Sequence, residues 1–142
     1  MTGLDSNILI QLAVTRHPQS VATTDLFLAE IARGETFALP SLVVTEFLHV
    51  VTDIRRFDPI IPQADALDWI ESFLNLTAVK TIEPNTASLQ LTFQWMRQFR
   101  LGRKRILDTH LAAALYTHGI TRLLTSNPRD FAVFQVFEII TP

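Results

Sequence analysis

Residues 1–14 read MTGLDSNILIQLAV, and this stretch decides the fold. The apolar residues at 1–4 predict a short strand, and residues 6–14 are apolar at helical spacing and predict a helix. Asp5 lies between the two. A carboxylate at such a junction either caps the helix, with Ser6 as the other cap candidate, or belongs to a functional site.

The alternation of short strands and helices continues along the rest of the chain. Further strands are expected at 36–39, 78–82, 121–125 and 136–140. Further helices are expected at 18–32, 41 to about 56, 63–76, 86 to about 102 and 106–118, with a loop at 58–62 and a turn at 126–130. Strands separated by helices form right-handed βαβ units, so we predict an α/β fold with a mostly parallel sheet of four or five strands. Ligands bind at the carboxyl ends of such strands, where Asp5, Asn127 and Asp130 are found.

Length and composition limit the kinds of protein that this chain can be. Its 142 residues suit a single domain spanning 1–142, and 48% hydrophobic residues suffice for a core. The absence of Cys excludes disulfides, thiolate catalysis and zinc–thiolate sites. A net charge of −2 gives no overall basic excess for nucleic acid. No apolar run approaches the roughly 20 residues of a membrane span and no targeting signal is recognisable, so we expect a cytoplasmic protein.

Two carboxylates interrupt apolar helix faces. Glu46 lies on the apolar stripe of the helix that starts at 41, and Asp108 faces an apolar surface near the start of the helix expected at 106–118. An acid on such a surface is unfavourable unless it is paired, protonated or bound to a metal. The simpler alternatives are a Glu46 that reaches solvent at the edge of the stripe and an Asp108 that caps its helix.

Asn127 and Asp130 follow the strand expected at 121–125. Asn-Pro and Asp are turn formers, so a plain turn is the simpler interpretation of this segment alone. Taken with Asp5, Glu46 and Asp108, the segment instead predicts several acids in one pocket. Clustered hard oxygen ligands suit Mg²⁺ or Mn²⁺, and without a cation such a cluster raises carboxyl pKa values. The chemistry of such sites is phosphoryl transfer.

Four motifs resemble the PIN domain family, most closely the VapC-type toxins of bacterial toxin–antitoxin modules. They are LDSNIL at 4–9, Glu46 after Thr45, ILDTHLA at 106–112 and LTSNPRDF at 124–131. The motifs occur in the family's order and cover nearly the whole chain. The resemblance implies a three-layer α/β/α fold and a Mg²⁺- or Mn²⁺-dependent endoribonuclease.

The resemblance also implies roles for individual residues. Asp5 and Asp108 would anchor the metal, and Glu46 would bind it or orient the attacking water. Water would attack phosphorus in line, giving 5′-phosphate and 3′-hydroxyl products. The fourth acidic position falls on Asn127, where many relatives have Asp, or on Asp130, which would then supply the missing carboxylate to the metal. The supporting polar residues would be Ser6, Asn7, Thr125 and Ser126.

A basic strip precedes Asp108 despite the near-neutral total charge. Five of the 12 Lys and Arg residues lie between 97 and 105. The strip is either a solvated helix end or a binding surface for phosphates. The residues that we predict to bind RNA are Arg100, Arg103, Lys104, Arg105 and Arg129.

The helices expected at 63–76 and 86–101 are apolar on two sides. Each is therefore either internal or covered by a partner. The resemblance implies both a homodimer and capture by a small antitoxin. His49 and His110 are expected to be packed or hydrogen-bonded rather than metal ligands.

Two other functions remain open from the sequence. A phosphatase would use Asp5 as a covalent nucleophile, although such enzymes have a second Asp at the position of Asn7. A PIN-like domain without catalysis would bind RNA or act as a scaffold, which the Asn at position 127 allows. An assay of RNA cleavage with added divalent metal separates these functions, because only a nuclease would cleave the RNA.

Overall fold

The computed structural model describes all 142 residues. Five strands form one sheet in the order β3-β2-β1-β4-β5, and every neighbouring pair is parallel. The strands are β1 (Thr2–Leu4), β2 (Phe37–Pro40), β3 (Val79–Ile82), β4 (Arg122–Leu124) and β5 (Glu138–Ile140). The α/β class and the parallel sheet predicted from the sequence are therefore confirmed.

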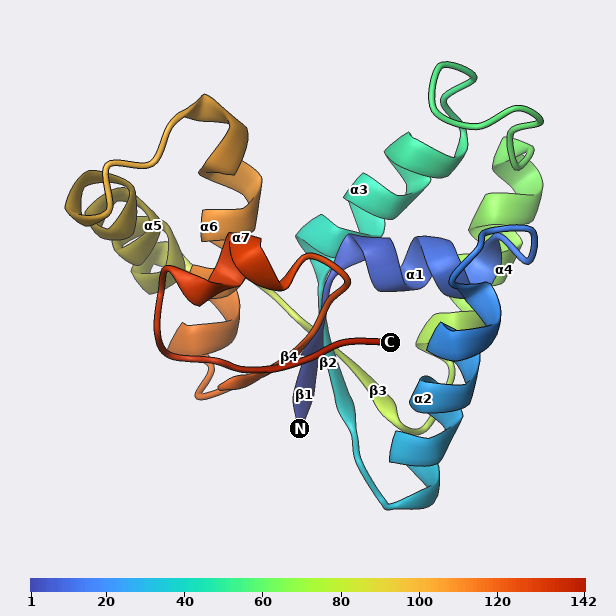
Figure 1. Cartoon of the computed structure of the whole chain (residues 1–142), viewed down its shortest axis with the longest axis horizontal. Coiled ribbons are helices and arrows are strands. Elements are labelled where there is room, and N and C mark those ends of the chain that lie inside the picture. Colours follow the sequence, from blue (N-terminus) through green and yellow to red (C-terminus); the bar gives the residue numbers. More distant parts are fainter.

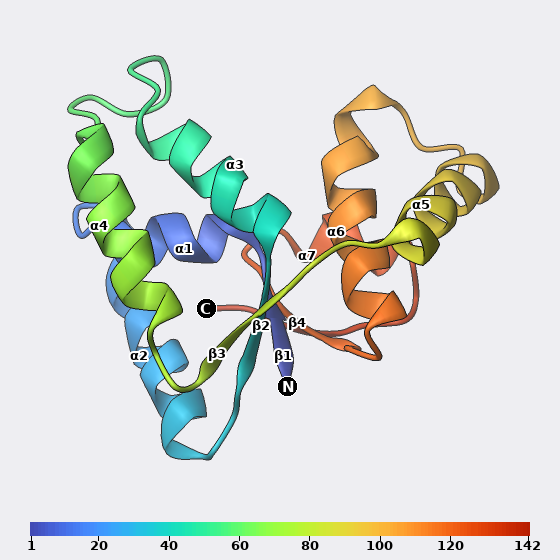
Figure 2. The ribbon, with the colours of Figure 1, turned by 180° about the vertical axis from the view of Figure 1, so that it is seen from behind.

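Helices cover both faces of the sheet. They are α1 (Ser6–Ala13), α2 (Ser20–Ala32), α3 (Ser41–Val51), α4 (Gln63–Leu74), α5 (Thr86–Gln98), α6 (Ile106–Thr117) and α7 (Pro128–Ala132), with a 3-10 turn at Arg103–Arg105. Figure 1 and the reverse view in Figure 2 show α1 to α4 on one side and α5 to α7 on the other. This is the three-layer α/β/α arrangement. None of the helices combines the length and apolarity needed to cross a bilayer.

The middle strand, β1, is buried on all sides. Leu4 is fully buried, and Gly3 allows α6 to approach, because a Cβ at this position would lie 2.5 Å from a methyl group of Leu115. The core continues on both faces through one cluster of 25 buried apolar residues. Its largest fully buried side chains include Phe37, Phe47 and Phe131. Burial of this kind is the main favourable contribution to folding.

Two local structures differ from the sequence prediction. α3 ends at Val51 instead of near Arg56. The carboxylate of Asp53 accepts hydrogen bonds from the backbone and side chain of Arg55, and such local bonding competes with helix continuation. The turn expected at 126–130 is instead the start of α7, which begins at Pro128, a residue well suited to the first helical position.

The register of the sheet brings the ends of β1 and β4 together. Leu4 lies opposite Leu124, and the backbone N–H of Asp5 donates to the carbonyl of Leu124 at 3.2 Å. The residues that follow the two strands, Asp5 and Thr125, are therefore neighbours. The carboxyl edge of the sheet is thus where the motifs of the two chain ends meet.

Candidate active site

Asp5 lies at the carboxyl end of the middle strand and is only 6% exposed. Its Oδ2 accepts hydrogen bonds from the hydroxyl of Thr125 at 2.6 Å and from the side-chain amide of Asn7 at 2.8 Å. Asp5 occupies the N-cap position of α1, but its side chain makes no capping hydrogen bond. The capping interpretation is therefore wrong, and the carboxylate of Asp5 is instead bonded to Thr125 and Asn7.

Burial raises the pKa of Asp5 to about 6, and the bond from Thr125 opposes this rise. The negative charges of Glu46 and Asp108 raise the pKa of Asp5 further. Both acids are therefore close enough to interact electrostatically with Asp5. A carboxyl that titrates near neutrality at the edge of a parallel sheet is typical of a functional site.

The predicted supporting residues form a connected network around Asp5. The amide of Asn7 also donates to the hydroxyl of Thr125 at 3.2 Å, and its carbonyl oxygen accepts from the backbone N–H of Ser126 at 3.1 Å. The hydroxyl of Ser6 lies 3.4 Å from Oδ1 of Asp5. These contacts fix Asp5 in one orientation.

Gln11 extends this network and was not predicted from the sequence. It is buried, and its side chain exchanges hydrogen bonds with Ser126 at 2.8 and 3.0 Å. Its carbonyl oxygen also accepts from the buried hydroxyl of Thr23 at 2.6 Å, which ties the site to α2. The available signal was spacing, because Gln11 follows Asn7 by four residues on an otherwise apolar helix.

Glu46 approaches the site from α3. It is partly exposed, and burial raises its pKa, with an opposing contribution from Ser6 and a further rise from the charge of Asp108. The side chain therefore bridges the interior and the solvent. It is not simply a solvated residue at the edge of an apolar stripe.

Asp108 and Asp130 share one cation, Arg105. Nε of Arg105 lies 3.2 Å from Oδ2 of Asp108, and another guanidinium nitrogen lies 3.7 Å from Oδ1 of Asp130. The guanidinium also donates to the backbone carbonyl of Asp130. Burial raises the pKa of Asp108, as does the charge of Asp130, whereas Arg105 lowers it. Asp108 thus forms an acid pair with Asp130 and is not a simple helix cap.

The predicted RNA-binding cations do not all face solvent. Arg105 is only 24% exposed and is engaged by the two acids, which differs from the free phosphate-binding role that we predicted. The other four, which are exposed around the start of α6 and on α7, are Arg100, Arg103, Lys104 and Arg129. A charge count along the sequence does not distinguish a paired cation from a free one.

Asn127 and Asp130 have different surroundings. The side chain of Asn127 is exposed and makes no capping bond, while its backbone N–H donates to the hydroxyl of Thr125 at 3.0 Å. Asp130 is the residue whose charge acts on Asp108. Of the two candidates for the fourth acidic position, Asp130 therefore has the contacts of a site carboxylate.

The donor set fits a hard divalent cation in its chemistry. Asp5, Glu46 and Asp108 are carboxylates whose pKa values are all raised, and a cation would offset both their repulsion and their burial. No three carboxylates or histidines stand close enough together to enclose an ion. An ion bound here would therefore have one or two carboxylate ligands and complete its coordination with water, as Mg²⁺ commonly does.

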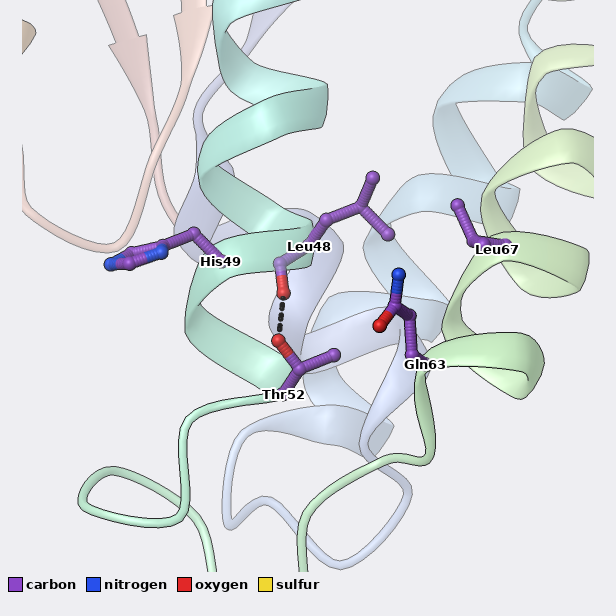
Figure 3. Close-up of a pocket in the computed structure, with 5 residues that line it drawn as sticks. All are labelled: Leu48, His49, Thr52, Gln63 and Leu67. Atoms are coloured by element: carbon purple, nitrogen blue, oxygen red, sulfur yellow. Dashed lines mark hydrogen bonds between the residues drawn. The ribbon is translucent and has the colours of Figure 1, made fainter.

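The two histidines have different surroundings. Nδ1 of His110 lies 3.0 Å from the hydroxyl of Thr92, so this side chain is hydrogen-bonded as expected. Burial lowers the pKa of His110. His49, which we expected to be packed or hydrogen-bonded, is instead exposed. A pocket of about 220 Å³ between α3 and α4 is lined by Leu48, His49, Thr52, Gln63 and Leu67. Figure 3 shows these side chains. No carboxylate lines this pocket, so it is separate from the acid site.

The fold and the site together define a parallel α/β protein with an acidic centre at the carboxyl edge of its sheet. The family model described as PIN domain matches residues 4–135, and the chain belongs to that family. The chain is 27% identical over 139 residues to "Ribonuclease VapC31" of Mycobacterium tuberculosis, which covers 98% of this chain and 96% of the relative. The resemblance stated from the motifs is therefore confirmed.

Solved structures show the same fold. The structure of Mycobacterium tuberculosis VapC20, titled a "Sarcin-Ricin loop cleaving toxin", has a TM-score of 0.68 and 12% identity over 87% of each chain. A toxin–antitoxin complex from Klebsiella pneumoniae has a TM-score of 0.63 and 17% identity over 100% of this chain and 98% of the other. At these identities the likeness establishes the fold.

Proposed function

We propose that this chain is an endoribonuclease of the VapC type that requires a divalent metal ion. The observation that carries the proposal is the buried Asp5, with its raised pKa, within electrostatic range of Glu46 and Asp108. The names of the relatives support the proposal, since one is a ribonuclease and another an RNA-cleaving toxin. Membership of the PIN family supports it as well.

The proposed cofactor is Mg²⁺ or Mn²⁺. Asp5 and Asp108 would hold it, with Glu46 and Asp130 as further ligands directly or through water. When bound, such an ion lowers the pKa of a water molecule and neutralises charge that develops on the phosphate. The hydrogen bonds from Thr125 and Asn7 keep the carboxylate of Asp5 in a fixed orientation for this purpose.

Glu46 is the proposed base. It is partly exposed, and its raised pKa brings it closer to the range in which a carboxylate accepts a proton at neutral pH. It would orient the attacking water and accept its proton on a carboxylate oxygen. Attack in line on phosphorus would then break the bond to the 3′ oxygen, which takes a proton from solvent water, and leave a 5′-phosphate and a 3′-hydroxyl. The exposed cations Arg103, Lys104 and Arg129 would contact flanking phosphates.

We also propose that the chain acts in the cytoplasm, as a homodimer, and is captured by a small antitoxin. The Klebsiella pneumoniae complex supports an antitoxin partner. Exposed apolar side chains on α4 and α5 supply surfaces for protein contacts, namely Leu67, Leu89 and Phe93. Light scattering of the isolated chain tests the dimer, and co-purification with the product of a small neighbouring gene tests the antitoxin.

The two other functions fit the structure less well. A covalent phosphatase needs an accessible nucleophile, whereas Asp5 is buried and hydrogen-bonded to Asn7. A scaffold without catalysis was suggested by Asn127. The proposed site still has a fourth acid despite the Asn at position 127, because the carboxylate of Asp130 is close enough to Asp108 to raise its pKa.

The test is cleavage of a single-stranded RNA pool by the purified chain in Mg²⁺, in Mn²⁺ and in EDTA. We expect cleavage with either metal and none with EDTA. Asp5→Asn and Asp108→Asn should each lower the rate by roughly 100-fold or more, as other losses of electrostatic stabilisation do. Asp25→Asn, at an exposed position on α2, is the matched control. Full activity of both site variants would exclude the proposed function.

A further inference from the structure

A hollow lies directly beside the acid site, between α3 and α6. It has a volume of about 270 Å³ and is lined by Leu42, Thr45, Glu46, His49 and Leu107. Four of these residues come from α3, and Leu107 comes from the first turn of α6, next to Asp108. We call this hollow the Leu107 pocket. Because Glu46 lines it, any occupant of the pocket also borders the proposed catalytic carboxylates.

Leu107 has no role in the core. Its side chain is 57% exposed although it adjoins the most charged part of the molecule. Leu42 provides a second apolar wall from the opposite helix and is partly buried. Two facing apolar walls suit the uncharged, flat portion of a ligand.

His49 adds a flat, polarisable side chain to the same pocket. It follows Glu46 by three residues on α3 and is exposed. In Figure 3 its imidazole points away from Leu48 and Gln63. Burial dominates the pKa of Glu46, but Arg56 and His49 lie close enough to lower it. The lining of the pocket therefore combines apolar side chains with an aromatic ring.

We propose that the Leu107 pocket binds one nucleobase of the RNA, beside the phosphate that is cleaved, and thereby contributes to sequence preference. This inference rests on the proposed ribonuclease function. Histidine rings and apolar side chains are common stacking platforms for unpaired bases in single-stranded RNA. The volume lies just below the range of pockets for drug-sized ligands and suits a single flat ring system more than a helix of another protein. The strand's phosphates would remain near Arg56 and the exposed cations of the 3-10 turn before α6, Arg103 and Lys104.

The first test measures binding and needs no cleavage. Adenosine 5′-monophosphate and ribose 5-phosphate, each in Mg²⁺, are titrated into the chain while NMR shifts are recorded. The two probes differ only in the base. We expect the nucleotide to bind about tenfold more tightly, the low end of the range for stacking of one base. Leu107→Ala and His49→Ala should each remove most of this difference.

Leu28→Ala is the matched control, since Leu28 on α2 is 56% exposed, almost the same as Leu107. It should keep the full difference between the two probes. Equal affinities of both probes for the unaltered chain would overturn the proposal. Unchanged nucleotide binding by Leu107→Ala, with a shift in oligomeric state, would assign the pocket to a contact between protein chains and would also overturn it.

The second test reads sequence preference from cleavage of a random-sequence RNA oligonucleotide. We expect the unaltered chain to prefer certain bases at one position next to the cut, and Leu107→Ala to flatten the preference at that position alone. A preference that stays the same in Leu107→Ala overturns the proposal. If the unaltered chain cleaves no RNA, the ribonuclease function fails, whereas the nucleotide titration still decides whether the pocket binds a base.

Discussion

Replacing Asp5 by Asn should stabilise the metal-free protein while it removes a catalytic carboxylate. Asp5 is 6% exposed, and burial is the main reason that its pKa rises from 3.8 to about 6. The folded chain therefore binds the carboxyl proton more tightly than the unfolded chain does. At neutral pH the ionised carboxylate consequently lowers the free energy of unfolding, and an Asn side chain of similar shape has no such charge.

The size of the effect follows from the two pKa values of Asp5, 3.8 when unfolded and about 6 when folded. Their difference corresponds to about 3 kcal/mol at pH 7.5, where the carboxyl is ionised in both states. The folded carboxyl takes up its proton first as the pH falls, so the effect shrinks to about half of this value at pH 5 and to about a fifth at pH 4. At pH 7.5 this is a rise of roughly 6–12 °C in Tm. These are upper values, because the Asn amide must find a new acceptor such as the hydroxyl of Ser6.

The assay is urea unfolding of the unaltered chain and of Asp5→Asn in EDTA at pH 7.5, 5 and 4. Asp25→Asn, exposed on α2, serves as the control and should match the unaltered chain. We expect a clear stabilisation at pH 7.5 that narrows steadily in acid. Added Mg²⁺ should stabilise the unaltered chain more than the variant. No difference at pH 7.5, or a difference of the same size at all three pH values, would refute the reasoning from a buried charge.

Three further predictions follow from the contacts around the site and at the opposite edge of the sheet. Thr125→Val removes the hydroxyl that lowers the pKa of Asp5, so the acid limb of the pH–rate profile should move to higher pH; an unmoved limb would contradict this. Arg103→Gln should reduce the salt dependence of RNA binding by about one unit of slope, whereas Arg105→Gln should leave it nearly unchanged because acids already neutralise that cation. Arg122→Met leaves two largely buried acids without their shared cation, and its unfolding free energy in urea should fall by about 1–2 kcal/mol. If Arg122→Met is as stable as the unaltered chain, the remaining cations are enough to neutralise the two acids: Arg33 pairs with Glu30, and the amino group of Met1 pairs with Glu35.

Much of the fold could be predicted because short apolar runs alternate with helical patterns. The burial of β1 and the acid that follows it are both visible in residues 1–14. The end of α3 was missed because the local bonding of Asp53 with Arg55 competes with a helical pattern that continues beyond it. Pro128 starts a helix instead of closing a turn, a distinction that residue type alone does not make.

The acids of the site could be predicted more readily than their partners. Asp5, Glu46 and Asp108 stand out because each interrupts an apolar surface. Arg105 was assigned to RNA because it belongs to a run of cations, whereas its spacing of three residues from Asp108 also allowed an ion pair on one helix face. Contacts between distant segments, such as that of Gln11 with Ser126, depend on the register of the sheet and are not visible in local patterns.

The position of β1 between β2 and β4 has a consequence for biosynthesis. The strand that carries Asp5 gains its second neighbour only when residues 122–124 have been made, nearly the whole chain later. Thr125, which holds the carboxylate of Asp5, arrives at the same moment. Because domains emerge from the ribosome over seconds, a nascent chain that stops short of β4 lacks both the sheet and the acid centre. The acid centre of this chain is therefore completed by residues that are among the last to be made.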